Sequence, residues 1–170
     1  MIKLLGAALI IASAASVGIR MAHNVRMEET NLRQILRVME LMQCEIKSCL
    51  TPTKELFEMA SGICRGALRD VFQATAQRIE LQTDGNTGEI MEAVLIRFGH
   101  QLPISCICRL RELGNILGAY EVQEQTQALE ALCARVSGSI EELRQGRAER
   151  CRSYEVMGVC AGCALAIILL

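Results

Sequence analysis

Apolar residues in the middle of the chain recur at spacings of three and four, the pattern of helices that bury one face. The first such segment runs from about Thr30 to Leu50, and its apolar stripe comprises Leu32, Ile35, Leu36, Met39, Met42, Ile46, Cys49 and Leu50. Thr51 and Pro52 interrupt the pattern: Thr51 is expected to cap the next helix and Pro52 to lie in its first turn. This second helix is expected to end near Ala60.

The same spacing predicts two helices on either side of a clear loop. The third helix is expected over about residues 67–82, with an apolar stripe formed by Leu68, Val71, Phe72, Thr75 and Ile79. Residues 84–88 read Asp-Gly-Asn-Thr-Gly, which are turn-forming residues and predict a loop. The fourth helix follows over about residues 89–100, with one face formed by Ile90, Ala93, Val94 and Phe98.

A fifth helix is expected from about Ile104 to Leu117, and Gly118 is expected to end it. The sixth begins near Tyr120, and its apolar stripe comprises Val122, Leu129, Leu132, Val136, Ile140 and Leu143. No segment shows the alternation and the β-branched enrichment of a strand. The sequence therefore predicts an all-α fold, a bundle of about six helices.

The two ends of the chain are apolar almost throughout. Residues 1–19 carry one charge, Lys3, and residues 156–170 carry none. A membrane-spanning helix needs about 20 apolar residues, so the first segment is long enough and the second is short. We expect a transmembrane helix over residues 1–22, a helical cytosolic domain over residues 23–155 and a second transmembrane helix over residues 156–170. Within the spans, small residues allow close helix packing, at Gly6, Gly158 and Gly162.

Basic residues set the expected orientation of these spans. Arg20 and Arg26 follow the first segment, and the second is preceded by Arg144, Arg147, Arg150 and Arg152. The positive-inside rule then places residues from about 20 to 155 in the cytoplasm. The nine cysteines support a reducing compartment, because an odd number cannot pair fully within one chain. Most of them are expected to be buried as small apolar side chains.

Composition excludes some classes of function. The 170 residues are 51% hydrophobic and carry a net charge of -1, unlike a disordered chain or a nucleic-acid binder. Two histidines leave little for a catalytic base, and Cys106 and Cys108 would point about 200° apart on a helix, unsuited to one metal. Cys160 and Cys163 have the spacing of a redox motif but lie in an apolar run, where helix packing is the simpler interpretation. We expect no enzyme, cofactor, metal site, nucleic-acid partner or small-molecule substrate.

Taken in order, several segments resemble the stage III sporulation protein AB family of endospore-forming Firmicutes. They are the opening Met-Ile-Lys-Leu-Leu-Gly, the helix LRQILRVMELMQCEIKSCLTP with Glu45-Ile46 and Thr51-Pro52, the segment LRELGNILGAYEVQEQTQALEAL with Gly114, Leu117, Gly118 and Gln125, and the closing YEVMGVCAGCALAIILL. The similarity covers essentially the whole chain. One departure is that an acidic residue often follows the Leu-Gly pair in the family, whereas here Glu121 is displaced by a residue or two.

The resemblance implies a non-enzymatic membrane subunit of the channel complex between mother cell and forespore. The family's central domain is similar to the cytoplasmic domains of type II secretion F proteins. By that analogy the chain would couple a cytosolic secretion-type ATPase, the sporulation protein AA, to other membrane subunits, and it would lie in the outer forespore membrane. F-type platform proteins also suggest a homo-oligomer.

Charged side chains near the family's motifs are the candidate contacts with partners. On the first helix of the bundle they are Arg33, Arg37, Glu40 and Glu45, and near the Leu-Gly segment they are Arg111, Glu112 and Glu121. Surface charges are most often simply solvated, so this assignment is a hypothesis about each residue.

Two other interpretations share the same sequence features. One is a membrane-anchored helical adaptor of a different assembly. The other is an exported protein whose first segment is a signal peptide cleaved after Ala14, at the Ala-Ser-Ala site.

Overall fold

Every regular element in the residues that the structure describes is helical, as the spacing of apolar residues predicts. The computed structural model describes residues 2–81, 85–119 and 123–145, and for residues 2–25 and 118–119 it describes the helical backbone without the side chains. The chain divides into two units. One, Thr30–Ile140, is the helical bundle, and the other combines Met1–Glu29 with Glu141–Leu170.

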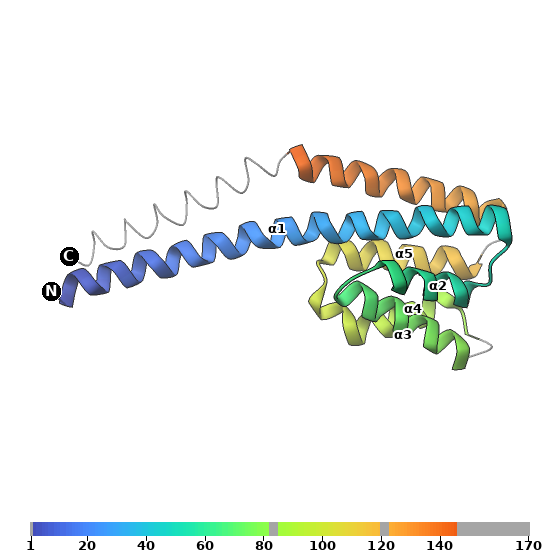
Figure 1. The fold of residues 1–170 in the computed structure, drawn as a ribbon, viewed down its shortest axis with the longest axis horizontal. Helices are drawn as coiled ribbons and strands as arrows, with labels where there is room; N and C mark the ends of the chain where they lie inside the picture. The colour runs from blue at the N-terminus through green and yellow to red at the C-terminus, as the bar shows by residue number, and fades with distance from the viewer. Residues whose placement is uncertain (1, 82–84, 120–122, 146–170) are drawn as a thin grey trace. The chain divides into compact units, whose positions relative to one another are not determined.

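Helix α1 (Ile2–Cys49) joins the N-terminal apolar segment to the first helix of the bundle without interruption (Figure 1). The sequence analysis places a helix start near Thr30, and the difference has a simple cause. Residues 20–29 contain neither Gly nor Pro, so nothing in that stretch ends a helix. Among the described side chains, no helix combines the length and the hydropathy needed to cross a membrane. The expected spans fall on residues 1–22, whose side chains are not described, and on residues 156–170, which lie outside the described residues.

Four further labelled α-helices follow in short succession. They are α2 (Thr53–Ile63), α3 (Ala67–Leu81), α4 (Thr87–Phe98) and α5 (Ile104–Ala119), with the short 3-10 helix η1 (Gly99–Gln101) between α4 and α5. The last helix within the described residues covers positions 123–145. Within the bundle α2 packs on α3, α3 on α4, and α4 on α5. The expected helix over residues 67–82 is confirmed almost to the residue.

The boundaries of three other helices differ from those expected. Thr51 does not cap α2: Pro52 occupies the N-cap position without a side-chain cap, and the helix continues past Ala60 to Ile63. Helix α4 begins inside the expected loop, because the Asn86 side chain accepts a hydrogen bond from the Gly88 amide and caps it there. Gly118 does not end α5, which continues to Ala119.

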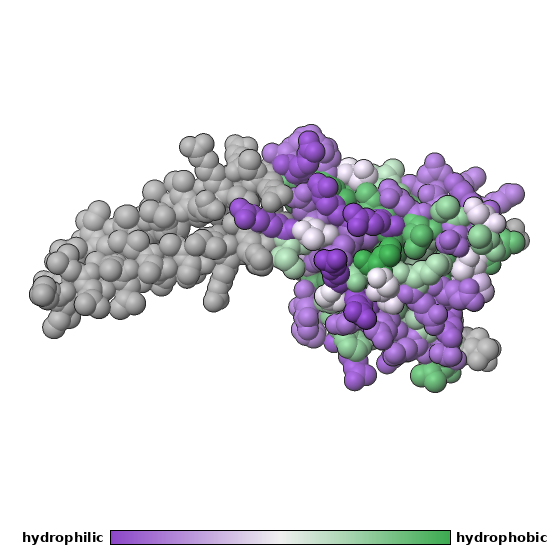
Figure 2. Space-filling model, viewed as in Figure 1, coloured by the Kyte–Doolittle hydropathy of each residue, from purple (hydrophilic) through white to green (hydrophobic). Residues whose placement is uncertain are grey.

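The core of the bundle contains most of the expected apolar stripes. Its largest fully buried side chains are Phe57, Phe72, Leu32, Ile35, Met39, Met42, Leu56, Leu68, Met91, Leu110, Leu113 and Leu129. The Phe57 and Phe72 rings are 6.1 Å apart and join α2 to α3. Polar residues cover most of the face of the bundle seen in Figure 2.

A few expected core positions are not buried. Cys49 and Leu50 are exposed at the end of α1, because Leu50 takes a left-handed conformation (φ 52°) that ends the helix. The expected stripes also include residues that are only half-buried, namely Leu36, Ile79, Ala93, Phe98 and Leu143. Val122 lies outside the described residues.

The prediction that most cysteines are buried is wrong for half of those described. Cys64 and Cys106 are buried and Cys133 is intermediate, whereas Cys44, Cys49 and Cys108 are exposed. All six are free thiols. Cys106 and Cys108 point to opposite faces of α5, as their spacing predicts, and no cluster of metal-ligating side chains occurs among the described residues.

Candidate functional site

The outer face of α1 carries three of the candidate partner contacts. Its exposed residues recur at spacings of three and four and comprise Arg33, Arg37, Glu40, Cys44 and Lys47. This set, called the outer stripe below, lies opposite the buried stripe that includes Ile35, Met39 and Met42. The helical register therefore brings Arg33, Arg37 and Glu40 together on one solvent-facing line.

Two members of the outer stripe lie near cysteine thiols outside α1, at Cys64 and Cys133. Burial raises the pKa of Cys64 to about 11, and the charge of Arg37 opposes this rise. Burial also raises the pKa of Cys133, and the carboxylates of Glu40 and Glu130 add to the rise. Arg37 thus lies near the end of α2, and Glu40 lies near the helix over residues 123–145. Within the described residues, neither Arg37 nor Glu40 forms a salt bridge.

Glu45, the fourth candidate on α1, faces the corner between α1 and α2. Its carboxylate accepts a hydrogen bond from the hydroxyl of Thr51 at 2.9 Å, and both residues are half-buried. The structure therefore joins the two parts of the motif that carries the family resemblance, and Glu45 is not part of the outer stripe.

Arg111 forms a bidentate salt bridge with a glutamate of a neighbouring helix. Its Nε and Nη2 donate to the two carboxylate oxygens of Glu92 on α4, at 2.5 and 2.8 Å. The hydrogen bond from Arg111 lowers the pKa of Glu92. This candidate contact thus links α5 to α4.

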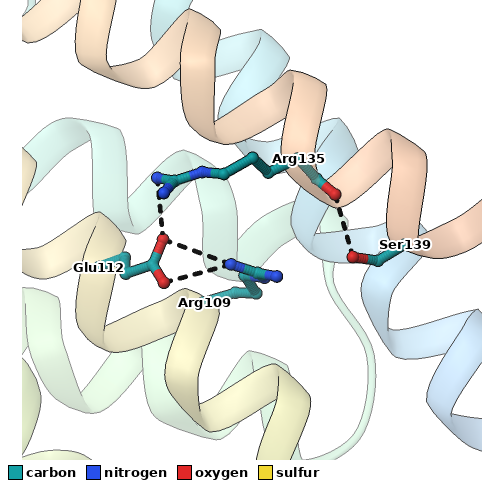
Figure 3. A network of polar contacts seen from close by, with 4 residues as sticks. All are labelled: Arg109, Glu112, Arg135 and Ser139. Atoms are coloured by element: carbon teal, nitrogen blue, oxygen red, sulfur yellow. Dashed lines mark hydrogen bonds and ion pairs between the residues drawn. The ribbon is translucent and has the colours of Figure 1, made fainter.

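Glu112 is the centre of a second charged network, shown in Figure 3. Its carboxylate accepts from Arg109 at 3.2 Å within α5 and pairs with Arg135 of the last helix at 3.1 Å. Ser139 donates to the backbone oxygen of Arg135 at 3.0 Å. The network joins α5 to the helix over residues 123–145. The sequence analysis identified only Glu112 among its members, because salt bridges between helices leave no local signal in the sequence.

The remaining predicted residues cannot be placed in a site. Glu121, Gly158 and Gly162 lie outside the described residues, and Gly6 lies in the part of α1 whose side chains are not described. Gly114, quoted for the resemblance, has a clear structural role: a Cβ there would lie 2.7 Å from the Cβ of Met91 on α4. The glycine permits the close approach of α4 and α5.

Two hollows on the bundle are lined mainly by polar side chains. One, of about 370 Å³, lies between α1 and the last helix and is lined by Lys47, Gln123, Thr126, Gln127 and Glu130. The other, of about 250 Å³, lies between α2 and α3 and includes Glu58, Arg69 and Gln77. Neither hollow contains any of the candidate contacts named from the sequence.

Comparison with known proteins adds one finding. A family model described as stage III sporulation protein AB matches residues 3–170. No curated protein and no solved structure matches the chain.

Proposed function

The chain belongs to the stage III sporulation protein AB family, and from this premise we propose that it is a non-enzymatic membrane platform for a sporulation complex. Membership of the family makes it a sporulation-related protein. In the proposed role it couples a cytosolic secretion-type ATPase to the membrane subunits of the channel complex between mother cell and forespore. This role needs a membrane attachment and a surface for the ATPase.

The apolar ends of the sequence are the proposed attachment. Residues 1–22 and 156–170 would span the outer forespore membrane, with the bundle in the mother-cell cytoplasm. Helix α1 is unbroken from Ile2 to Cys49. This supports the coupling role, because a continuous helix transmits a movement of one end to the other better than a jointed one. The distribution of Lys and Arg supports the orientation.

The outer stripe of α1 is the proposed ATPase surface. Among the candidate contacts, Arg111 and Glu112 pair with other helices of the bundle and Glu45 is bonded to Thr51. Arg37 and Glu40 are exposed on a helix and form no salt bridge with described residues. Unpaired, positioned charges of opposite sign suit an electrostatic contact with a partner. This contrast is the observation that carries the proposal.

Charge reversal on the outer stripe tests the proposal. We purify the full-length Glu40→Arg variant and the unchanged chain from sporulating cells. We expect at least tenfold less ATPase to co-purify with the variant. Glu55→Arg is the matched control, since Glu55 is also exposed but lies on α2. Glu55 is in the first turn of α2, where negative charge is favourable. Its reversal should therefore destabilise the fold at least as much as the reversal of Glu40. Equal ATPase retention by the two variants would remove the outer stripe from the proposal.

The exposed native thiols test the proposed orientation. A membrane-impermeant maleimide should modify Cys44, Cys49 and Cys108 only after lysis of the cells, with the modified peptides identified by mass spectrometry. Modification of these residues in intact cells would contradict a cytoplasmic bundle and favour export.

A further inference from the structure

Two helix connections lie at the same end of the bundle, next to the residues of α1 around Thr30. They are the α2–α3 and the α4–α5 connections. The Gln34 side chain of α1 accepts a hydrogen bond from the Arg65 amide at 2.8 Å, which places the α2–α3 connection near Thr30. Thr75 of α3 contacts Met91 of α4, and α3 also packs on η1, so the α4–α5 connection lies at the start of α3. We call this the Thr30 end. The salt bridge between Lys54 and Glu80 brings the start of α2 close to the end of α3, so Leu50 and Leu81 lie at the opposite end, called the Leu50 end.

Large apolar side chains are exposed at the Thr30 end. Ile96, near the end of α4, is 78% exposed, and Ile104, the first residue of α5, is 79% exposed. Ile63, the last residue of α2, is 44% exposed. Each isoleucine occupies the last or first turn of its helix, next to a connection, where an outward-pointing side chain can reach beyond the bundle.

Three exposed arginines at the same end lie on or next to these connections. Arg65, Arg69 and Arg97 are exposed and form no salt bridge with any described residue. Elsewhere in the described chain Lys54, Arg109, Arg111, Arg135 and Arg144 pair with glutamates, whereas Arg37, Lys47 and Arg78 form no salt bridge with described residues. Over residues 61–70 and 96–104 the only acid is Asp70. These two connections therefore combine exposed isoleucines with an excess of positive charge.

We propose that the Thr30 end of the bundle rests on an anionic lipid surface. In this arrangement Ile96 and Ile104 enter the boundary between headgroups and acyl chains, a depth of about 5–10 Å for interfacial helices. Arg65, Arg69 and Arg97 bind the lipid phosphates, because arginine forms bidentate hydrogen bonds with phosphate groups. The inference rests on the proposed function, in which residues 1–22 span the membrane and end a few residues before Thr30 in the sequence. A second copy of the chain is a poorer occupant, since it would bring like charges together.

The absence of tryptophan from the chain provides a direct test. The full-length Ile104→Trp variant contains a single tryptophan at the Thr30 end, and Leu81→Trp is its matched control, because Leu81 is 82% exposed at the Leu50 end. Each variant is reconstituted into phosphatidylcholine vesicles with and without phosphatidylglycerol. Lipids brominated near the headgroup serve as quenchers.

In vesicles containing phosphatidylglycerol we expect quenching to reduce the fluorescence of Ile104→Trp at least twofold and to leave Leu81→Trp nearly unchanged. The double reversal Arg65→Glu and Arg97→Glu in the Ile104→Trp chain should remove most of the quenching. Quenching that is equal at positions 81 and 104, or absent at 104, would overturn the proposal. An emission blue shift at 104 without quenching would also overturn it, because it would identify a protein rather than a lipid as the occupant.

Co-sedimentation of the same samples separates this inference from the proposed function. If the chain sediments with the vesicles and Ile104→Trp is not quenched, the lipid contact of the bundle fails and the membrane attachment stands. If the chain stays in the supernatant, both fail.

Discussion

The hydroxyl of Thr51 donates a hydrogen bond to the carboxylate of Glu45 across the corner between α1 and α2, at 2.9 Å. Between the two residues, Leu50 takes the left-handed conformation that ends α1. A left-handed backbone is unfavourable for a residue with a side chain. The hydrogen bond between Thr51 and Glu45 therefore helps to hold the corner in this conformation.

Removing the hydroxyl of Thr51 should destabilise the bundle. Thr51→Val keeps the shape of the side chain and loses the hydrogen bond, which we expect to lower the free energy of unfolding by about 1 kcal/mol. Urea unfolding of the detergent-solubilised chain, followed by circular dichroism, measures the change. Thr53→Val is the control, since Thr53 is also half-buried and its hydroxyl has no hydrogen-bond partner among the described residues. A loss as large for Thr53→Val would show that the corner bond adds nothing.

Alanine substitutions at two glycines should have opposite effects. Gly114→Ala places a Cβ 2.7 Å from Met91 where α4 and α5 cross, and such overpacking costs about 1–3 kcal/mol. Gly62→Ala in α2 meets nothing within 4 Å and should stabilise the chain by up to about 1 kcal/mol through helix propensity. The same unfolding experiment compares them. Equal effects of the two substitutions would contradict the close helix crossing.

The contact between Glu112 and Arg135 should give a small, salt-dependent coupling. Both side chains are partly exposed, so we expect about 0.5 kcal/mol from a double-mutant cycle of Glu112→Gln and Arg135→Gln. The coupling should fall at high ionic strength because salt screens exposed charges. Glu141→Gln, which removes a contact within one helix, should show no coupling to Arg135→Gln. A cycle energy near zero at low salt would remove the contact as a link between α5 and the last helix.

Alkaline pH should destabilise the bundle through Cys64. Burial raises the pKa of this thiol to about 11, above the 9.0 of an unperturbed cysteine. The folded state then holds the proton more tightly than the unfolded state, so its contribution to stability is complete below about pH 9 and is lost as the pH rises through 11. Unfolding measurements between pH 8 and 11 should show this decline.

The substitution Cys64→Ala should reduce the decline with pH, whereas Cys44→Ala should leave it unchanged, because Cys44 is exposed. In the folded chain at neutral pH, Cys44 should react with iodoacetamide at least tenfold faster than Cys64. Comparable rates would contradict the burial of Cys64.

The sequence by itself determined the helices and the family of this protein. Helix formation depends on neighbours three and four residues away, so the apolar spacing located α3 to within one residue and excluded strands from the described chain. The ordered motifs identified the family, which the match to residues 3–170 confirms. The opposite orientations of Cys106 and Cys108 also followed from spacing alone.

Only the tertiary structure decided how the charged residues are used. Arg111 and Glu112 looked like free surface charges, yet their partners are Glu92, 19 residues away, and Arg135 on the last helix. The same applies to the helix crossing at Gly114 and to the Thr51 hydroxyl, which binds Glu45 rather than capping α2. These contacts depend on the depth and register at which helices pack, and that register is set by burial summed over the whole core rather than by any local stretch of sequence.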